Sequence, residues 1–165
     1  MKKLEHLDLF SFRIIGEQKQ VLLDSLIALY NEYVKAYQSK DIKWYGGMRF
    51  SINDGCFITG WGHSKVEKTL KSLCNGIKHN NKTFKPVEEK SKNGKKIHGY
   101  FSINVDELDR LCNYIENYKS EWKRDNEKWI AENKADEFGI DEALKIMASQ
   151  NYELLYKKYR NNKKG

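Results

Sequence analysis

Hydrophobic residues near the N-terminus predict a strand followed by a long helix. Phe10, Phe12 and Ile14 recur at a period of two, which is typical of a strand, and we expect that strand to span residues 7–15. Over residues 17–39 the apolar positions change to a spacing of three and four. This spacing predicts an amphipathic helix whose apolar stripe packs on a sheet.

Residues 46–80 predict a β-hairpin followed by a second helix. Asp54 and Gly55 form a pair that favours a two-residue type I′ turn, because both central positions of that turn need a positive φ. Ser64 and Glu67 have the spacing of a capping box, in which the hydroxyl accepts a backbone N–H three residues further on. The second helix is therefore expected to begin at Ser64 and to run to about His79.

A second hairpin is expected around Asn93 and Gly94, which form another pair that favours a type I′ turn. Counting outward from this turn pairs Val87 with Tyr100. Pro86 lacks the backbone N–H that a central strand donates to its neighbour. Its strand is therefore expected at the edge of a sheet.

The last third of the chain predicts two more helices. Asn104 is a favourable N-cap for a helix over residues 105–133, and a further apolar pattern predicts a helix over residues 140–159. We expect residues 1–135 to form one α+β domain, with residues 136–165 as a C-terminal helix packed on it.

The motif LxxLCNxI occurs twice, at residues 70–77 and 108–115. It suggests a duplicated ββα unit, although two amphipathic helices can share this spacing for packing reasons alone. The predicted fold is α+β. An antiparallel sheet is formed by two β-hairpins and an N-terminal strand, an N-terminal helix packs on it, and C-terminal helices follow.

Positive charge is concentrated in the middle of this 165-residue chain. The net charge is +7, and residues 44–100 alone hold 11 basic and 4 acidic side chains. A localised basic surface favours a polyanionic partner, either nucleic acid or an acidic protein face, whereas dispersed lysines only aid solubility. The candidate binding residues are Arg49, Lys65, Lys68, Lys71, Lys78, Lys90, Lys92, Lys95 and Lys96.

Cysteine usage and hydropathy indicate a cytoplasmic protein. The odd number of cysteines, at Cys56, Cys74 and Cys112, is typical of reduced thiols. Acidic side chains interrupt the apolar residues near the N-terminus, whereas a secretory leader contains an uninterrupted apolar run. No segment reaches the roughly 18 uninterrupted apolar residues of a membrane span, so no membrane partner is expected.

No catalytic motif stands out, so we expect a non-enzymatic protein that needs no cofactor and no metal. The leading hypothesis is a protein whose basic centre binds nucleic acid or a nucleoprotein complex. Its size and charge also fit a phage-type inhibitor of a host nucleic-acid-targeting machine, of the anti-CRISPR kind.

Two alternatives remain open at this stage. The first is a protein–protein interaction module that uses the C-terminal helices, with Trp122 and Trp129 as partner-binding aromatic anchors. The second is a metal-dependent ββα nuclease. Its candidate residues are Asp54, His63, Asn75 and His79.

Overall fold

The computed structural model is α+β, as the sequence predicts. It describes residues 3–39, 49–92, 95–128, 154–155 and 157–158. The helices are η1 (Leu9–Ser11), α1 (Phe12–Ile15), α2 (Glu17–Gln38), α3 (Ile52–Thr59), α4 (His63–Asn75) and α5 (Val105–Asp125). The strands are β1 (Phe50–Ser51), β2 (Ile77–His79), β3 (Lys82–Phe84), β4 (Val87–Lys92) and β5 (Lys95–Ile103).

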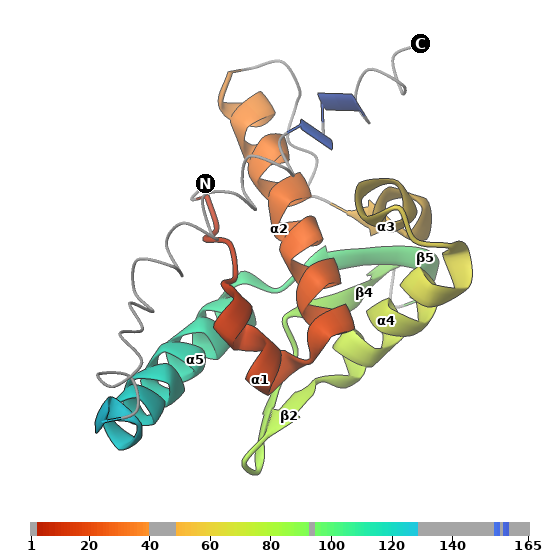
Figure 1. The fold of residues 1–165 in the computed structure, drawn as a ribbon. Helices are drawn as coiled ribbons and strands as arrows, with labels where there is room; N and C mark the ends of the chain where they lie inside the picture. The colour runs from red at the N-terminus through yellow and green to blue at the C-terminus, as the bar shows by residue number, and fades with distance from the viewer. Residues whose placement is uncertain (1–2, 40–48, 93–94, 129–153, 156, 159–165) are drawn as a thin grey trace.

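The strands form one antiparallel sheet and one separate hairpin. The sheet has the order β1-β5-β4, and β2 pairs with β3 in a separate two-stranded sheet. Helix α2 crosses in front of the sheet, with α3 and α4 on one side of it and α5 on the other (Figure 1). The largest wholly buried side chains lie between these layers and include Leu22, Leu26, Ile27, Phe50, Ile58, Leu70, Leu73, Phe84 and Phe101.

The N-terminal segment is helical, so the strand expected over residues 7–15 is wrong. Phe10 and Ile14 are buried, but Phe12 is only half-buried and Ile15 is buried beside Ile14. The buried positions thus follow a helical spacing, and the alternation that suggested a strand covers only three residues. Elements η1 and α1 occupy this segment.

The first expected hairpin is also wrong, because helix α3 occupies its turn. Ser51 and Asp54 form a capping box: Ser51 Oγ accepts the Asp54 N–H at 3.1 Å, and an Asp54 carboxylate oxygen accepts the Ser51 N–H at 2.9 Å. Gly55 therefore lies inside a helix. A Cβ at Gly55 would lie 2.7 Å from Val66 Cγ1, so glycine permits the close approach of α3 to α4.

Helix α4 is confirmed, but not its expected cap. Its N-cap is Gly62, which makes no side-chain cap hydrogen bond, so the Ser64–Glu67 capping box is wrong. After α4 the chain forms the β2–β3 hairpin, which the sequence reading missed. Because a helix rather than a hairpin precedes α4, the two LxxLCNxI helices do not belong to duplicated ββα units.

The β4–β5 hairpin is confirmed with a different register. Lys92 pairs with Lys95, so two residues separate the strands as expected. A β-bulge between Glu89 and Ser91 shifts the remaining pairs, and Val87 faces Ile103 instead of Tyr100. Strand β4 is an edge strand, as predicted from Pro86.

The long helices α2 and α5 were both predicted. Asn104 caps α5 by accepting the Glu107 N–H at 3.2 Å, and the helix ends at Asp125. The helix expected over residues 140–159 lies outside the described residues, except for helical positions at 154–155 and 157–158. The proposed division at residue 136 also falls outside them.

Candidate functional site

Helix α4 has one buried apolar face and one exposed lysine face. Val66, Leu70 and Leu73 are buried against the rest of the core. The lysines at positions 65, 68 and 71 lie three residues apart and are exposed. The helix therefore turns a row of positive charges toward solvent.

The row of lysines continues into the β2–β3 hairpin, which projects from the C-terminal end of α4 (Figure 1). Residues 63–85 contain six lysines and a single acidic residue, Glu67. All six lysines are exposed. We call this surface the basic edge, which consists of Lys65, Lys68, Lys71, Lys78, Lys82 and Lys85.

The acidic residue of this segment offsets little of the charge. Glu67 accepts a hydrogen bond from Lys71 Nζ at 3.0 Å and lies 3.6 Å from His63 Nδ1. Both pairs are exposed i,i+4 pairs, which are individually weak.

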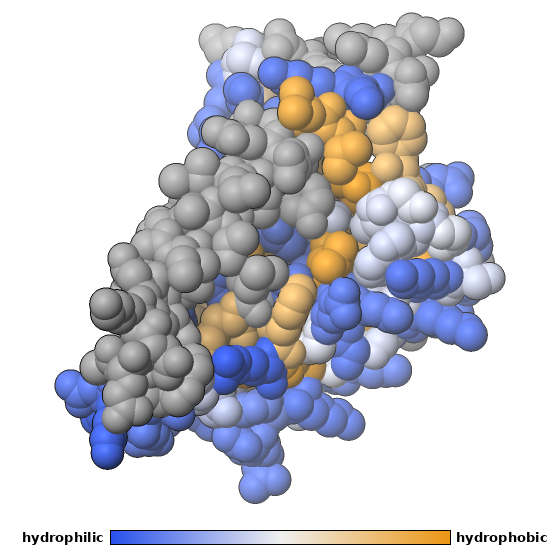
Figure 2. Space-filling view, viewed as in Figure 1, coloured by the Kyte–Doolittle hydropathy of each residue, from blue (hydrophilic) through white to orange (hydrophobic). Residues whose placement is uncertain are grey.

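Figure 2 shows hydrophilic side chains along the lower margin of the molecule, below the apolar patch over α2.

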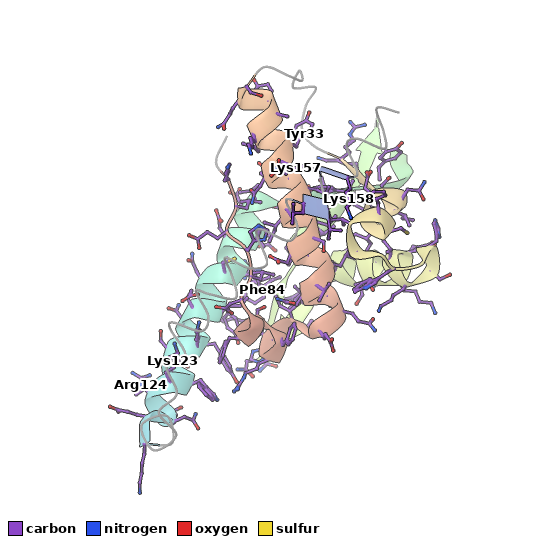
Figure 3. All side chains as sticks on the ribbon, turned by 45° about the horizontal axis from the view of Figure 1, so that its top comes forward. Tyr33, Phe84, Lys123, Arg124, Lys157 and Lys158 are labelled. Atoms are coloured by element: carbon purple, nitrogen blue, oxygen red, sulfur yellow. The ribbon has the colours of Figure 1, made fainter. Side chains whose placement is uncertain are left out.

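Helix α5 holds the β2–β3 hairpin from one side. His79 Nδ1 lies 2.6 Å from the Tyr114 hydroxyl, and the His79 ring packs edge-on against Tyr118 at 5.0 Å between centroids. Phe84 contacts Tyr114 with centroids 5.1 Å apart. Figure 3 labels Phe84 near the middle of α5, whereas Lys123 and Arg124 lie near its end.

The base of the hairpin is tied to α5 by a charged group. Arg110 bonds the Glu107 carboxylate at 2.7 Å and also donates to the Thr83 carbonyl, and the Lys85 N–H donates to Glu107 at 3.1 Å. The Arg110 hydrogen bond, supported by the Lys85 N–H, lowers the pKa of Glu107. The carboxylate therefore stays ionised to a lower pH than an ordinary glutamate and continues to accept both hydrogen bonds.

The candidate basic residues outside the basic edge lie just before β1 or on β4–β5. Within the basic edge, Lys65 Nζ lies 4.0 Å from the centroid of the Trp61 ring, a cation–π contact. Arg49 is exposed just before β1, and Lys90 is half-buried on β4. The other three candidates, Lys92, Lys95 and Lys96, lie on the β4–β5 ladder.

Trp122, one of the expected partner-binding aromatics, is half-buried and packs against the core. Its ring meets Phe10 edge-on at 5.7 Å, and the Arg13 guanidinium lies 4.3 Å from its centroid. It thus helps to fix α1 to α5. Trp129 lies outside the described residues, so the partner-binding role of the pair stays a prediction.

The four residues considered for a nuclease have separate roles. Asp54 belongs to the α3 cap, His63 lies at the start of α4, and His79 contacts Tyr114. Asn75 is the last residue of α4. Over residues 3–39, 49–92 and 95–128 and the short segments near 155, no group of three or more His, Cys, Asp or Glu side chains could hold a metal ion.

Each of the three cysteines is half-buried and forms no disulfide bond. Burial raises the pKa of the Cys56 thiol. A thiol with a raised pKa holds its proton at neutral pH and is a poor nucleophile.

A groove beside the basic edge was not anticipated. It has a volume of about 460 Å³ and lies between the start of α2 and α4, so Lys68 borders both the groove and the basic edge. Its walls are formed by Ile15, Gly16, Glu17, Gln18, Lys19, Lys68, Thr69 and Ser72. Only the tertiary arrangement of α2 and α4 brings Lys19 and Lys68 to one groove, so no local pattern could reveal it.

Comparison with protein-family models, with curated proteins and with solved structures found no match. None of the helices in the described part of the chain has the length and apolar character needed to cross a membrane.

Proposed function

We propose that this protein binds nucleic acid through the basic edge and performs no chemistry on it. The observation that carries the proposal is the charge of residues 63–85, where six exposed lysines accompany one carboxylate. Such a surface attracts the phosphate backbone, and release of the counterions condensed on nucleic acid drives the binding.

The dimensions of the basic edge suit a phosphate backbone. Lys65 and Lys71 are six residues apart on helix α4, which spans roughly 9 Å at 1.5 Å per residue. One strand of B-DNA carries one phosphate per about 3.4 Å of helix axis. The lysines on α4 can therefore reach several consecutive phosphates, and the β2–β3 hairpin extends the contact beyond the end of the helix.

The rigidity of the basic edge also supports the proposal. Helix α4 is fixed by its buried apolar face, and the hairpin is fixed by His79, Phe84 and Arg110 against α5. Lysines on a fixed backbone lose less conformational entropy on binding than lysines on a mobile loop. The charges are thus presented in one arrangement.

Replacement of two lysines tests the proposal. Lys68→Gln with Lys78→Gln removes two positive charges from the basic edge. The slope of log K against log salt concentration for a DNA duplex is expected to become shallower by about 2. The matched control is Lys3→Gln with Lys35→Gln, which removes the same charge from exposed positions outside the basic edge.

The control distinguishes local contact from net charge. If both double variants change the slope equally, binding follows the overall charge and the basic edge is not the site. If neither changes it, the lysines do not contact phosphate and the proposal fails.

Inhibition of a nucleic-acid-targeting machine is a narrower form of the same proposal. A surface that binds phosphate can compete with such a machine for its nucleic acid. The small size and basic centre of the chain support this form. Competition is tested by adding the protein to a nucleoprotein complex of the native host: excess free nucleic acid is expected to reverse any inhibition, and persistence of inhibition would contradict it.

A further inference from the structure

The β2–β3 hairpin is a narrow, projecting element with a firm turn. Its tip is Asn80 and Asn81, whose φ angles of 47° and 65° are both positive, as a type I′ turn requires. Both asparagines are exposed. No acidic residue occurs between Gly76 and Val87. The hairpin therefore presents amide and ammonium groups, and no carboxylate of its own.

An isolated two-stranded hairpin is only marginally stable in water, so its rigidity must come from elsewhere. Ladder partners share a face of the hairpin, and the pairs His79–Lys82 and Ile77–Phe84 share the face toward α5. On that face Lys82 Nζ lies 5.3 Å from the Tyr114 ring centroid. The hairpin is thus fixed along one face.

The opposite face of the hairpin is open. Lys78 pairs with Thr83, and both side chains are exposed. Lys85 lies two residues beyond Thr83 and is also exposed. This face therefore carries two ammonium groups near its base, and the two asparagine amides lie at the tip. The hairpin thus combines positive charge near its base with hydrogen-bonding side chains at its tip.

We propose that the β2–β3 hairpin enters the major groove of B-form DNA and that the basic edge contacts the flanking phosphates. This inference rests on the proposed function and narrows it to a substrate class. A two-stranded ribbon fits the B-DNA major groove, which is about 12 Å wide and 8.5 Å deep. The major groove of A-form RNA is deep and narrow and does not admit side chains from such a ribbon.

The chemistry of the tip agrees with this placement. Asparagine amides carry both a donor and an acceptor and can bond the adenine edge in the major groove, whereas lysines at the base suit phosphates. In a single strand the grooves are absent, so Asn80 and Asn81 add nothing there. The hairpin thus supplies a preference for duplex DNA, and the other lysines supply affinity for any nucleic acid.

The test compares three length-matched ligands, which are duplex DNA, duplex RNA and single-stranded DNA, at one low salt concentration by fluorescence anisotropy. The wild-type protein is expected to bind duplex DNA about tenfold more tightly than duplex RNA. The variant Asn80→Gly with Asn81→Gly keeps the positive φ angles of the turn and removes both amides. It is expected to lose that preference while single-strand binding stays unchanged.

The outcomes separate this inference from the proposed function. Equal binding of duplex DNA and duplex RNA by the wild-type protein overturns the inference, as does an unchanged preference in the glycine variant. In either case, weakening of all three complexes by Lys68→Gln with Lys78→Gln leaves the proposed function standing. If none of the three ligands binds, both proposals fail.

Discussion

Lys119 Nζ lies 3.0 Å from Asp8 Oδ2, and the two side chains are only 7% and 3% exposed. The pair joins residues 111 positions apart in the chain, one on α5 and one before η1. Two buried charges are costly to desolvate, and each requires the other. This contact therefore fixes α5 to the N-terminal segment, and with it the face on which the β2–β3 hairpin rests.

Breaking this ion pair is expected to destabilise the fold strongly. Asp8→Asn removes the carboxylate that contacts the buried Lys119 ammonium and should lower the free energy of unfolding by about 3–5 kcal/mol. The combined change Asp8→Asn with Lys119→Met removes both charges and should restore part of the loss. Urea unfolding measures both. A double variant less stable than Asp8→Asn alone would contradict this account.

Gly55 is expected to tolerate no side chain. In Gly55→Ala the new Cβ would lie 2.7 Å from Val66 Cγ1. Overpacking of this kind costs about 1–3 kcal/mol, against a gain in helix propensity of about 1 kcal/mol. The variant should melt at a lower temperature, and Val66→Ala in the same chain should make the Gly55→Ala change less costly. Equal costs in both backgrounds would show that Val66 is not the obstacle.

The Glu107–Arg110 contact predicts a pH dependence at the base of the hairpin. The pKa of Glu107 is lowered in the folded protein, chiefly by the Arg110 hydrogen bond. A lowered folded pKa stabilises the protein above the unfolded pKa of glutamate, and this contribution is lost as the pH falls through the folded pKa. Urea midpoints of the wild type and Glu107→Gln should therefore converge toward acid pH. A gap that does not change with pH would refute the prediction.

Removal of the Tyr114 hydroxyl should loosen the hairpin and leave the core intact. Tyr114→Phe keeps the ring that contacts Phe84 and loses the 2.6 Å hydrogen bond to His79. A net loss of about 1 kcal/mol is expected. Hydrogen exchange should accelerate in residues 77–84 relative to α2. Exchange that rises equally in both segments would indicate a global rather than a local effect.

Local sequence patterns correctly predicted the elements for which the sequence offered only one pattern. Helices α2 and α5 followed from long apolar stripes, and the β4–β5 link followed from its Asn-Gly pair. Asp54 belonged to two conflicting patterns, a turn with Gly55 and a capping box with Ser51. The capping box formed because α3 can then bury Ile58 and pack on α4.

The candidate site was predictable only in part. Lys65, Lys68, Lys71 and Lys78 were expected on the surface and are exposed. Lys82 and Lys85 were not among the predicted binding residues, because the sequence patterns did not predict the β2–β3 hairpin. Its turn at Asn80 and Asn81 was hidden by a helix expected to run to residue 79. Its packing on α5 depends on distant residues such as Tyr114, which lies 35 positions from His79.

The salt dependence of binding to duplex DNA tests the central claim most directly. If the six lysines of the basic edge each neutralise one phosphate, a plot of log K against log salt concentration should have a slope of about −5. A steep linear loss of affinity near that value is the predicted result. A slope near zero, or no binding at low salt, would contradict the claim that the basic edge binds phosphate.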